Sequence, residues 1–287
     1  MITQRDIAFW RTIAPWSNDL MVEQDYLLSR AVEAIFSDPY LRKNVAMRGG
    51  TVLHKAHLAP PMRYSEDIDL VLVAKAKQGS IKSALARALK PLLGVPTESA
   101  FTQIQLAVRN FLAKSTILRT TYTYDPYSDE AAHSHLKVEV NTNETKSFYP
   151  LVEIELEVPN GVESSKSISV VSYDLDEMLG TKLRALLQRD HGRDLYDLWW
   201  AWRVSEQDAS ATKVNPARVG AAFRFYMKNE DSTFSASSVE QELSRRLKSK
   251  KFLRDMDNYL RVGQSYSAEE ACKEFCAVFL PHLDAPA

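Results

Sequence analysis

The sequence has 287 residues and a nearly balanced charge, with 36 Lys and Arg against 37 Asp and Glu and a net charge of −1. This length exceeds that of an average domain, so one two-lobed unit or two domains is expected, and the 45% hydrophobic content is enough for a sizeable core. The charge balance excludes a protein that binds nucleic acid through bulk basicity. Any such partner must be held by local basic patches.

Nothing in the sequence indicates export or membrane insertion. Residues 1–10 lack a basic segment followed by an apolar core, and no apolar run approaches the roughly 18 residues of a membrane span. Cys272 and Cys276 are spaced i, i+4 with His282 nearby, which is too few ligands for a structural zinc, so we interpret both cysteines as small core residues. We therefore expect a soluble protein of a reducing cytoplasm, with no membrane partner.

Hydrophobic periodicity predicts that helices and strands alternate in the first hundred residues. The predicted elements are, in chain order, a helix over 19–37, a short strand over 41–47, a brief helix over 51–58, a strand over 68–73 and a helix that follows Ser80 as N-cap and ends at Gly94. The run 68–73 is almost continuously branched and apolar, which is typical of a strand buried on both faces.

A change of period divides the remaining sequence. Over 101–173, apolar and polar residues alternate with a period of two, which predicts strands around 116–124, 136–141 and 152–157. The period then returns to 3.6 and predicts helices over 173–189, 192–204, 215–228, 237–248, 252–262 and 267–280, with a linker over 205–215. We therefore expect an α+β (mixed α/β) fold, with a sheet domain and its N-terminal helix over 1–172 and a helical C-terminal lobe over 173–287.

Two aspartates, Asp67 and Asp69, begin the apolar run of the strand over 68–73. Residues i and i+2 of a strand share one face, so the two carboxylates can point at one place. Such a pair repels unless a cation lies between them, and hard oxygen ligands suit Mg²⁺. Two such ions can activate an attacking hydroxyl and neutralise a leaving pyrophosphate, so the pair predicts metal-assisted nucleotidyl transfer.

The glycine pair Gly49 and Gly50 opens the brief helix over 51–58. Glycines let the backbone approach a phosphate closely, a helix N-terminus presents free N–H groups, and the Thr51 hydroxyl can add one donor. A glycine pair alone or an Asp-x-Asp pair alone is usually structural. The order of glycine pair, short helix and strand with two aspartates is more specific for a nucleotide site.

These residues carry a resemblance to a known family. Gly49-Gly50-Thr51, followed by Arg63-Tyr64-Ser65-Glu66-Asp67-Ile68-Asp69-Leu70, resembles the AbiEii/AbiGii toxin family of the DNA polymerase β-like nucleotidyltransferase superfamily. Residues 177–189 resemble the family's lysine helix, and 193–198 resemble its Arg-Asp-x-x-Asp-Leu motif. The similarity runs from about residue 45 to residue 200. It implies a polymerase β-like nucleotidyltransferase sheet domain whose active site is completed by the helical lobe.

The resemblance also implies ligands and roles. It implies Mg²⁺ or Mn²⁺ as metal and an NTP as substrate. The catalytic residues would be Asp67, Asp69, Lys182 and Asp194; the nucleotide would contact Gly49, Gly50, Thr51, Arg63, Ser65 and Lys182; the metal would be held by Asp67, Asp69 and Glu139. Glu139 shares one face of its strand with Lys137 and Asn141, and that face is either a third metal ligand site or an ordinary polar strand face.

Lys182 and Asp194 occupy the two helices predicted after the sheet. Lys182 and Arg189 lie along one edge of an apolar stripe, where a lysine either extends to solvent or contacts phosphate. Asp194 lies nearer the stripe of its helix than Asp197 does, and it either pairs with Arg189 at the helix start or enters the active site. The resemblance selects Lys182 for phosphate and Asp194 for orienting Lys182 or for acid/base work. We interpret Asp197 as structural.

Other polar and aromatic residues are open to plainer interpretations. His54 and His57 are expected to be packed or exposed rather than metal ligands, and the tryptophans of 199–202 are expected in the core. Glu153, Glu155 and Glu157 predict a solvated strand face. The basic run 245–251 either contacts a phosphate backbone or is a solvated helix end.

The sequence therefore predicts a Mg²⁺-dependent nucleotidyltransferase, and the resemblance makes it the toxin of a bacterial toxin–antitoxin pair. The expected reaction moves an NMP from an NTP to an acceptor hydroxyl, with tRNA or another RNA as acceptor and a separately encoded antitoxin as partner. Two alternatives are a transferase that modifies a small molecule and a catalytically silent module that only binds NTP.

Overall fold

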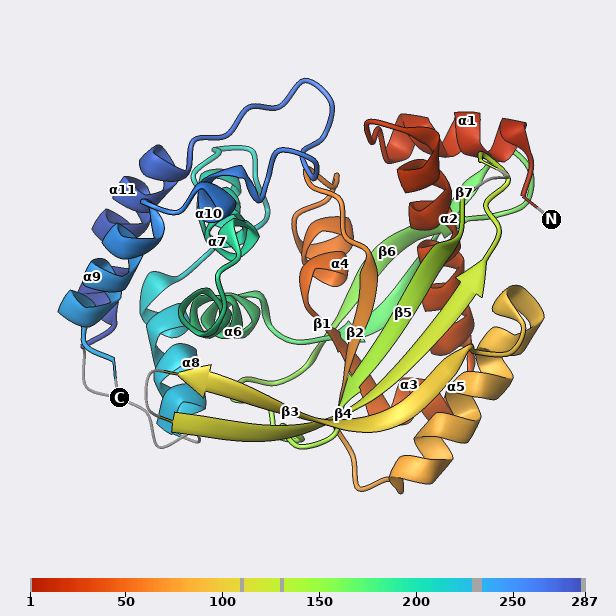
Figure 1. Ribbon diagram of the computed structural model, residues 1–287, viewed down its shortest axis with the longest axis horizontal. Helices are drawn as coiled ribbons and strands as arrows, with labels where there is room; N and C mark the ends of the chain where they lie inside the picture. The colour runs from red at the N-terminus through yellow and green to blue at the C-terminus, as the bar shows by residue number, and fades with distance from the viewer. Residues whose placement is uncertain (1, 109–110, 130–131, 229–233, 285–287) are drawn as a thin grey trace.

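A seven-stranded mixed sheet forms the centre of the computed structural model, which describes residues 2–108, 111–129, 132–228 and 234–284 (Figure 1). The strands are β1 (Val45–Arg48), β2 (Asp67–Leu72), β3 (Glu98–Val108), β4 (Phe111–Tyr124), β5 (Ser134–Asn141), β6 (Val152–Pro159) and β7 (Ser165–Ser172). Their order in the sheet is β3-β4-β5-β2-β1-β7-β6. The pairs β2–β5 and β1–β7 are parallel and the other neighbours are antiparallel. The predicted mixed α/β fold is confirmed.

The first hundred residues contribute several helices, and the two longest cover one face of this sheet (Figure 1). The helices are α1 (Gln4–Ile13), α2 (Asp19–Ser37), α3 (Pro39–Asn44), α4 (Gly50–Val52) with a π-helical turn over Leu53–His57, and α5 (Gln78–Leu93). The long helix α2 packs against α5 and against several strands, and its apolar side chains Leu28, Val32 and Ile35 are fully buried. The strand centres are thereby closed on that side, which leaves the opposite face of β2 available for a site.

The second helical group follows β7 directly. It lies on the side of the molecule opposite α1, α2 and α5 (Figure 1). It comprises α6 (Leu175–Gln188), α7 (Gly192–Ser205), α8 (Pro216–Lys228), α9 (Ala236–Arg246), α10 (Lys250–Arg254), α11 (Ala268–Val278) and a 3-10 turn over Leu280–His282. Within the described ranges, no helix combines the length and the apolar character needed to cross a membrane.

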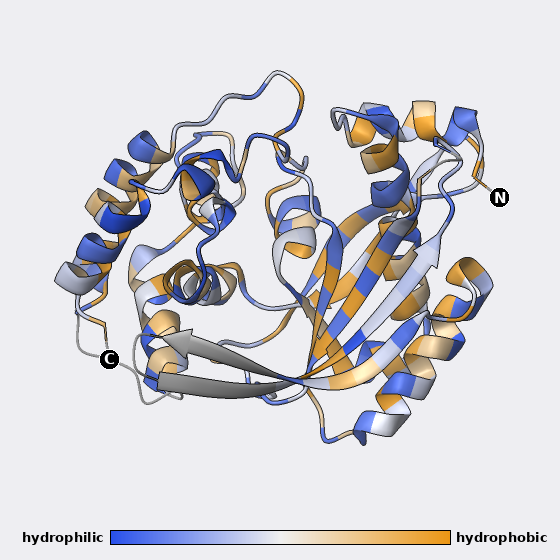
Figure 2. Cartoon of the chain, viewed as in Figure 1, coloured by the Kyte–Doolittle hydropathy of each residue, from blue (hydrophilic) through white to orange (hydrophobic). Residues whose placement is uncertain are grey.

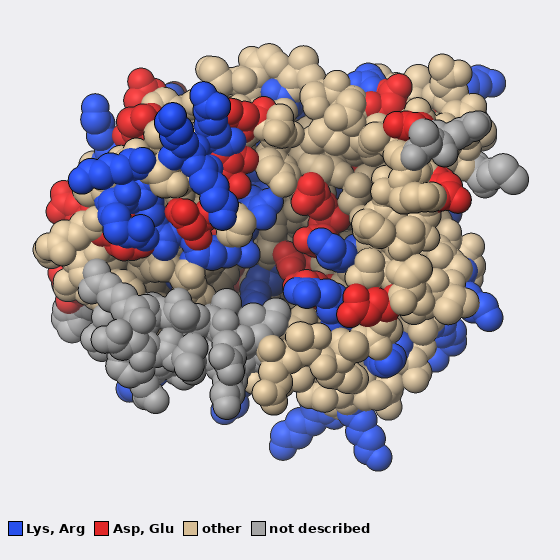
Figure 3. Space-filling model, in the orientation of Figure 1, with Lys and Arg blue, Asp and Glu red and all other residues tan. Residues whose placement is uncertain are grey.

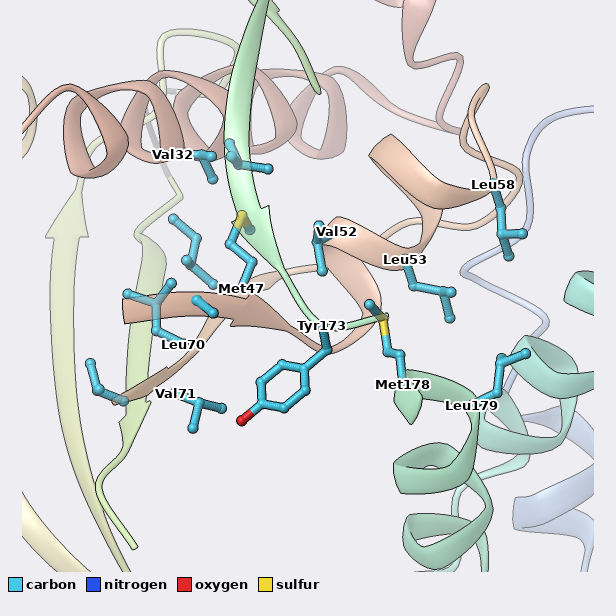
Figure 4. Packing of buried hydrophobic residues seen from close by; sticks show 14 of the residues in the cluster. Val32, Met47, Val52, Leu53, Leu58, Leu70, Val71, Tyr173, Met178 and Leu179 are labelled. Carbon is cyan, nitrogen blue, oxygen red and sulfur yellow. The ribbon is translucent and has the colours of Figure 1, made fainter. Parts of the chain in front are cut away.

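One continuous hydrophobic core joins the sheet to the second helical group. Figure 4 shows Tyr173, at the end of β7, lying between the β1–β2 strands and the start of α6, with Met178 and Leu179 next to Leu53 of the π-helical turn. Apolar residues alternate with polar ones along the strands in Figure 2, as expected for strands with unequal faces. The predicted core positions are confirmed for the tryptophans of 199–202 and for Cys272 and Cys276, which pack on this core as free thiols.

Two predicted elements are wrong in type or extent. Residues 39–44 form α3 instead of a strand, because Asp38 caps the helix by accepting from the N–H groups of Tyr40 (2.9 Å) and Leu41 (3.0 Å), and strand β1 begins only at Val45. The helix predicted over 252–262 ends at Arg254.

The chain beyond Arg254 forms long-range contacts in place of a longer helix. Tyr64 donates its N–H to the carbonyl of Tyr259 at 2.7 Å, and Leu260 forms an isolated bridge with Arg63. Smaller differences concern α1, which was not predicted, and α5, which starts at Gln78 after Lys77 so that Ser80 lies inside the helix.

The contact between α6 and α8 depends on a glycine. A Cβ atom added to Gly180 of α6 would lie 2.8 Å from the Cβ of Ala222 and 2.9 Å from the backbone nitrogen of Phe223. Both neighbours belong to α8, so no flexible side chain end can move aside. Gly180 therefore sets how closely α8 packs on the helix that carries Lys182.

We expect Gly180→Ala to lower the free energy of unfolding by about 1–3 kcal/mol, because an added methyl overpacks the α6–α8 contact. The matched control is Gly79→Ala in α5, where an added Cβ meets nothing within 4 Å and the helix propensity of Ala raises stability by at most about 1 kcal/mol. Urea unfolding of both variants is the measurement. Equal stability of the two variants would contradict the close helix contact.

Candidate active site

Four neighbouring strands place charged residues in one row across the open face of the sheet. Arg48 of β1 pairs with Asp69 of β2, Asp69 pairs with Glu139 of β5, and Glu139 pairs with Arg119 of β4. Directly paired residues in a sheet have side chains on the same face. Asp67 lies on the same face, two residues earlier in β2, and its partner is Lys137. Ile68 and Leu70 point the other way and are buried, so the alternation predicted for the two aspartates is confirmed.

The turn before α4 touches the Asp69 carboxylate. Gly49 has φ +87°, a conformation that favours glycine, and an added Cβ would lie 2.0 Å from Oδ2 of Asp69. An added Cβ on Gly50 would lie 2.5 Å from Nη2 of Arg63 and 3.0 Å from Oγ of Ser65. The glycine pair therefore brings the backbone against both the acidic strand and the Arg63–Ser65 segment.

The Thr51 hydroxyl has a different role from the predicted one. It is fully buried and donates at 2.7 Å to the main-chain oxygen of Asp67. The expectation that this hydroxyl donates to a phosphate is therefore wrong for this arrangement, because a buried donor bonded to the backbone does not face the cleft. Thr51 instead fixes the start of β2 to the start of α4.

Burial and mutual repulsion perturb the two aspartates. Burial, followed by the neighbouring Asp69 charge, raises the pKa of Asp67 to about 6. Burial and the Glu139 carboxylate raise the pKa of Asp69, and the positive charges of Lys182 and of Arg48 partly offset that rise. Lys137, 3.9 Å from Asp67, likewise only partly offsets the rise for Asp67. Both pKa values stay raised, so the protein's own cations do not fully neutralise the ionised pair.

Asp197 of α7 is the centre of a buried charge network. Its carboxylate accepts from Arg63 at 2.6 Å (Nε) and 2.8 Å (Nη2), from Lys182 at 2.8 Å and from His54 at 2.8 Å. Burial alone would raise the pKa of Asp197, but the charges of Arg63 and Lys182 hold it well below the usual range. Asp197 therefore ties α6 and the segment before β2 to one point on α7.

Asp194 of α7 binds Arg189, which directly follows α6. Its carboxylate is fully buried, accepts two hydrogen bonds from Arg189 at 2.7 and 2.8 Å, and lies 3.4 Å from Nζ of Lys182. Against the effect of burial, the charges of Arg189 and Lys182 lower the pKa of Asp194. The expected proximity of Asp194 to Lys182 is confirmed, but Asp197 forms the shorter contact with Lys182. The structural role expected for Asp197 agrees with this network, but its contact with Lys182 was not foreseen, because residues i and i+3 of a helix can both face inward.

A third network was missed entirely from sequence. Glu144, in the loop after β5, forms ion pairs with Arg48 of β1 and Arg184 of α6. Against the effect of burial, these two charges lower the pKa of Glu144 to about 2. Its sequence context is an ordinary polar loop, so no local signal could have revealed that β1 and α6 meet there. Glu144 is a second link between the sheet and the helical part.

Glu139 lies where a third carboxylate was expected, directly beside Asp69 in the sheet. Its carboxylate is bonded to Nε of Arg119 at 2.7 Å. In the described ranges, no three His, Cys, Asp or Glu side chains are gathered closely enough to hold a metal ion unaided. A metal at Asp67 and Asp69 would thus need further ligands from outside the chain, or the release of Glu139 from Arg119.

The two predicted histidines lie behind the site as packed residues. Both are buried: His54 contacts Asp197, and His57 lies 3.1 Å from the Ser172 hydroxyl. Burial lowers the pKa of His54 and of His57 to about 4, so both imidazoles are neutral near pH 7. Their predicted packing is confirmed.

These groups surround one cleft of about 510 Å³ between the sheet and α6–α7, seen as the hollow at the centre of Figure 3. Its walls include eight cationic residues: Arg48, Arg63, Arg119, Lys137, Lys182, Arg184, Arg189 and Arg193. Five acidic residues join them: Glu66, Asp67, Asp69, Glu139 and Glu144. The acids lie chiefly on the strands and the cations of α6 face them. Such a cleft suits a ligand that has phosphate groups and carries a cation.

We expect Asp197→Ala to lower the free energy of unfolding by roughly 3–5 kcal/mol, because it leaves the Arg63 and Lys182 charges buried without their main partner. The matched control, Asp208→Ala, removes an exposed carboxylate and should change stability by less than about 0.5 kcal/mol. Chemical unfolding in urea measures both. A loss at Asp197 as small as that at Asp208 would rule out the network as a structural link.

We expect Gly49→Ala to displace the Asp69 carboxylate, because its methyl would overlap Oδ2 and because φ +87° is strained for alanine. The measurable result is a larger loss of unfolding free energy in urea than the backbone strain alone would cause. Gly94→Ala, at a similar φ of +73° but in open space, is the matched control for backbone strain. A loss of stability for Gly49→Ala no larger than that for Gly94→Ala would contradict the close contact.

Comparison with known proteins agrees with this geometry. A family model for the nucleotidyl transferase AbiEii toxin of type IV toxin–antitoxin systems matches residues 30–278. The fold is similar to that of MenT4, a nucleotidyltransferase toxin from Mycobacterium tuberculosis H37Rv, with a TM-score of 0.61 and 15% identity over 99% of this chain and 91% of that chain. Among curated proteins, no match to the sequence is found. The chain belongs to the AbiEii family of nucleotidyltransferase toxins of type IV toxin–antitoxin systems.

Proposed function

We propose that this nucleotidyltransferase moves an NMP from an NTP to a hydroxyl of an RNA acceptor, with tRNA as the first candidate, in a Mg²⁺- or Mn²⁺-dependent reaction. The observation that carries the proposal is the opposition of Asp67 and Asp69 on β2 to Lys182 on α6 and to Arg189, just after α6, across one cleft. Carboxylates suit the metal and cations suit the triphosphate.

Asp67 and Asp69 fit the metal. Both are hard oxygen donors on one strand face, and burial together with repulsion from nearby carboxylates raises both pKa values. A divalent cation would remove that repulsion, and Mg²⁺ commonly uses one or two carboxylates plus substrate phosphates. When bound, the metal supplies charge neutralisation at the reacting phosphate. Glu139 is the proposed third carboxylate, available once Arg119 releases it.

The other residues of the cleft hold the nucleotide. The Gly49–Gly50 turn brings backbone N–H groups close to Asp69, Lys182 contributes a point charge for phosphate oxygens, and Arg63 and Ser65 flank the turn. Lys182 is only 8% exposed and is held by two carboxylates, so it is preorganised and loses little freedom on binding.

Transfer itself requires an acceptor oxygen to attack the α-phosphorus while the bond to the β-phosphate oxygen breaks and pyrophosphate leaves. The hydroxyl proton must go to a base. Asp194 is a poor base because its pKa is lowered and both of its oxygens bind Arg189. We therefore assign Asp194 to positioning Lys182 and Arg189, which is one of the two roles expected for it.

The biological setting follows from the family. Members of a type IV toxin–antitoxin system act beside a separate antitoxin, so we propose a separately encoded antitoxin for this chain. A small-molecule acceptor and a silent NTP-binding module are the competing proposals, and both predict no labelled RNA. Incubation with each labelled NTP, Mg²⁺ and total tRNA separates the RNA acceptor from both alternatives by whether the label becomes acid-insoluble.

We expect Asp69→Asn to reduce NMP transfer by roughly 100-fold or more, because a metal ligand and its charge are lost while the shape is retained. Mg²⁺ with NTP should raise the melting temperature of the wild-type protein and leave that of Asp69→Asn nearly unchanged. Asp208→Asn, at an exposed position, is the matched control for both readouts. Wild-type transfer by a correctly folded Asp69→Asn protein would defeat the assignment.

A further inference from the structure

A basic surface adjoins the cleft on its helical side. Residues 245–254, at the end of α9 and through α10, contain six Lys or Arg and no Asp or Glu. Figure 3 shows Lys and Arg side chains gathered over this part of the molecule, next to the central hollow. We use the name α10 basic surface for its four solvent-exposed cations, Lys248, Lys250, Lys251 and Arg254.

The cations of this surface differ from their neighbours in having no acidic partner. Arg245 and Arg246 both pair with Glu242 of the same helix. For the four cations of the α10 basic surface, no salt bridge to any described residue is found. Four exposed like charges within seven residues repel each other, and a polyanion would relieve that repulsion. The surface is therefore suited to a phosphate backbone rather than to an internal structural role.

The α10 basic surface is physically continuous with the cleft. The Asp255 carboxylate, just after α10, accepts from the N–H of Arg193 at 3.0 Å, and the Phe252 carbonyl lies against Gly192. Arg246 donates to the carbonyl of Leu187 at 3.0 Å. These bonds fix α9 and α10 against the turn between α6 and α7. Arg189 and Arg193 extend from that turn into the cleft, so the positive charge continues from α10 to the site.

The size of the cleft argues for an acceptor that lies partly outside it. A volume of about 510 Å³ is that of a small-molecule site, so it accommodates a nucleotide and a chain end but not a duplex. Arg193 lies at the wall with its guanidinium 5.2 Å from the Tyr259 ring, and both residues line the cleft. An RNA end that passes these two residues would place the rest of its backbone over α10.

We propose that the α10 basic surface binds the phosphate backbone of the RNA acceptor and directs its end past Arg193 toward Asp69. This inference rests on the proposed function, because it presupposes an RNA acceptor. It adds where the RNA lies and assigns the basic run to phosphate binding. It also explains how a chain of net charge −1 can hold a polyanion, since the contact is local.

The test is a triple variant, Lys248→Gln, Lys250→Gln and Lys251→Gln, titrated with fluorescent tRNA over a series of salt concentrations. The log of the association constant falls linearly with the log of the salt concentration, and each phosphate contact contributes about 0.7–0.9 to the steepness of that line. Loss of three contacts should therefore make the slope shallower by about 2–3. At 150 mM salt the Kd should rise roughly 50- to 100-fold. The KM for tRNA should rise with it, while kcat and NTP affinity stay at wild-type values.

Two matched triple variants serve as controls. Replacement of the same three lysines by Arg keeps the charge and should keep the slope. Lys75→Gln, Lys77→Gln and Lys90→Gln removes three exposed charges around α5, which lies away from α10 in Figure 1, and should leave RNA binding unchanged. Urea unfolding should be the same for all variants, since every substituted side chain is exposed.

The outcomes separate the inference from the proposed function. If the wild-type protein labels tRNA while the α10 variant binds tRNA with unchanged Kd and slope, the surface is wrongly assigned and the proposed function stands. An equal weakening of tRNA binding in the variant with Lys75, Lys77 and Lys90 replaced would also overturn the inference, because it would show an effect of total charge. If the wild-type protein neither binds nor labels RNA, the surface and the RNA acceptor both fail, and labelling of a small acceptor would still show NMP transfer.

Discussion

The buried Asp197 carboxylate is the contact on which both sides of the site depend. It binds Arg63 from the segment before β2 and Lys182 from α6, and all three side chains are nearly excluded from solvent. Removing charges from water is costly, and the cost is offset only when good geometry and extra hydrogen bonds satisfy every group. The bidentate Arg63 contact and the neutral His54 provide these bonds. The position of Lys182 is thus set by the fold.

A division of charge across the cleft follows from this anchoring. The strand side carries Asp67, Asp69 and Glu139 in adjacent positions, while the helical side presents Lys182 and Arg189 already held by buried aspartates. The helical cations are close enough to lower the pKa of Asp69, yet burial and Glu139 still raise it. The protein alone leaves the acidic strand under-neutralised. The metal-bound triphosphate proposed above carries charges of both signs that match the two sides of this cleft.

Much of this arrangement could be predicted from sequence because its signals are local. Strand alternation was enough to place Asp67 and Asp69 on one face, and helical periodicity located α6 and α7 to within two residues. Glu144 could not be found this way, since its meaning comes from Arg48 and Arg184, which lie 96 and 40 residues away. The Thr51 hydroxyl was misassigned for the same reason, because its acceptor is the backbone of a strand 16 residues later.

Local segregation of charge gives the near-zero net charge a functional meaning. Glu153, Glu155 and Glu157 form an exposed row along β6, as predicted, where each accepts from a serine of β7. A group of exposed cations without a salt bridge to a described residue lies instead on the α10 basic surface, beside the cleft. Fields from exposed charges fall off over about 8–10 Å at physiological salt, so each region acts mainly on what binds next to it. A polyanion is repelled at the glutamate row of β6 and attracted next to the cleft, which orients its approach without bulk basicity.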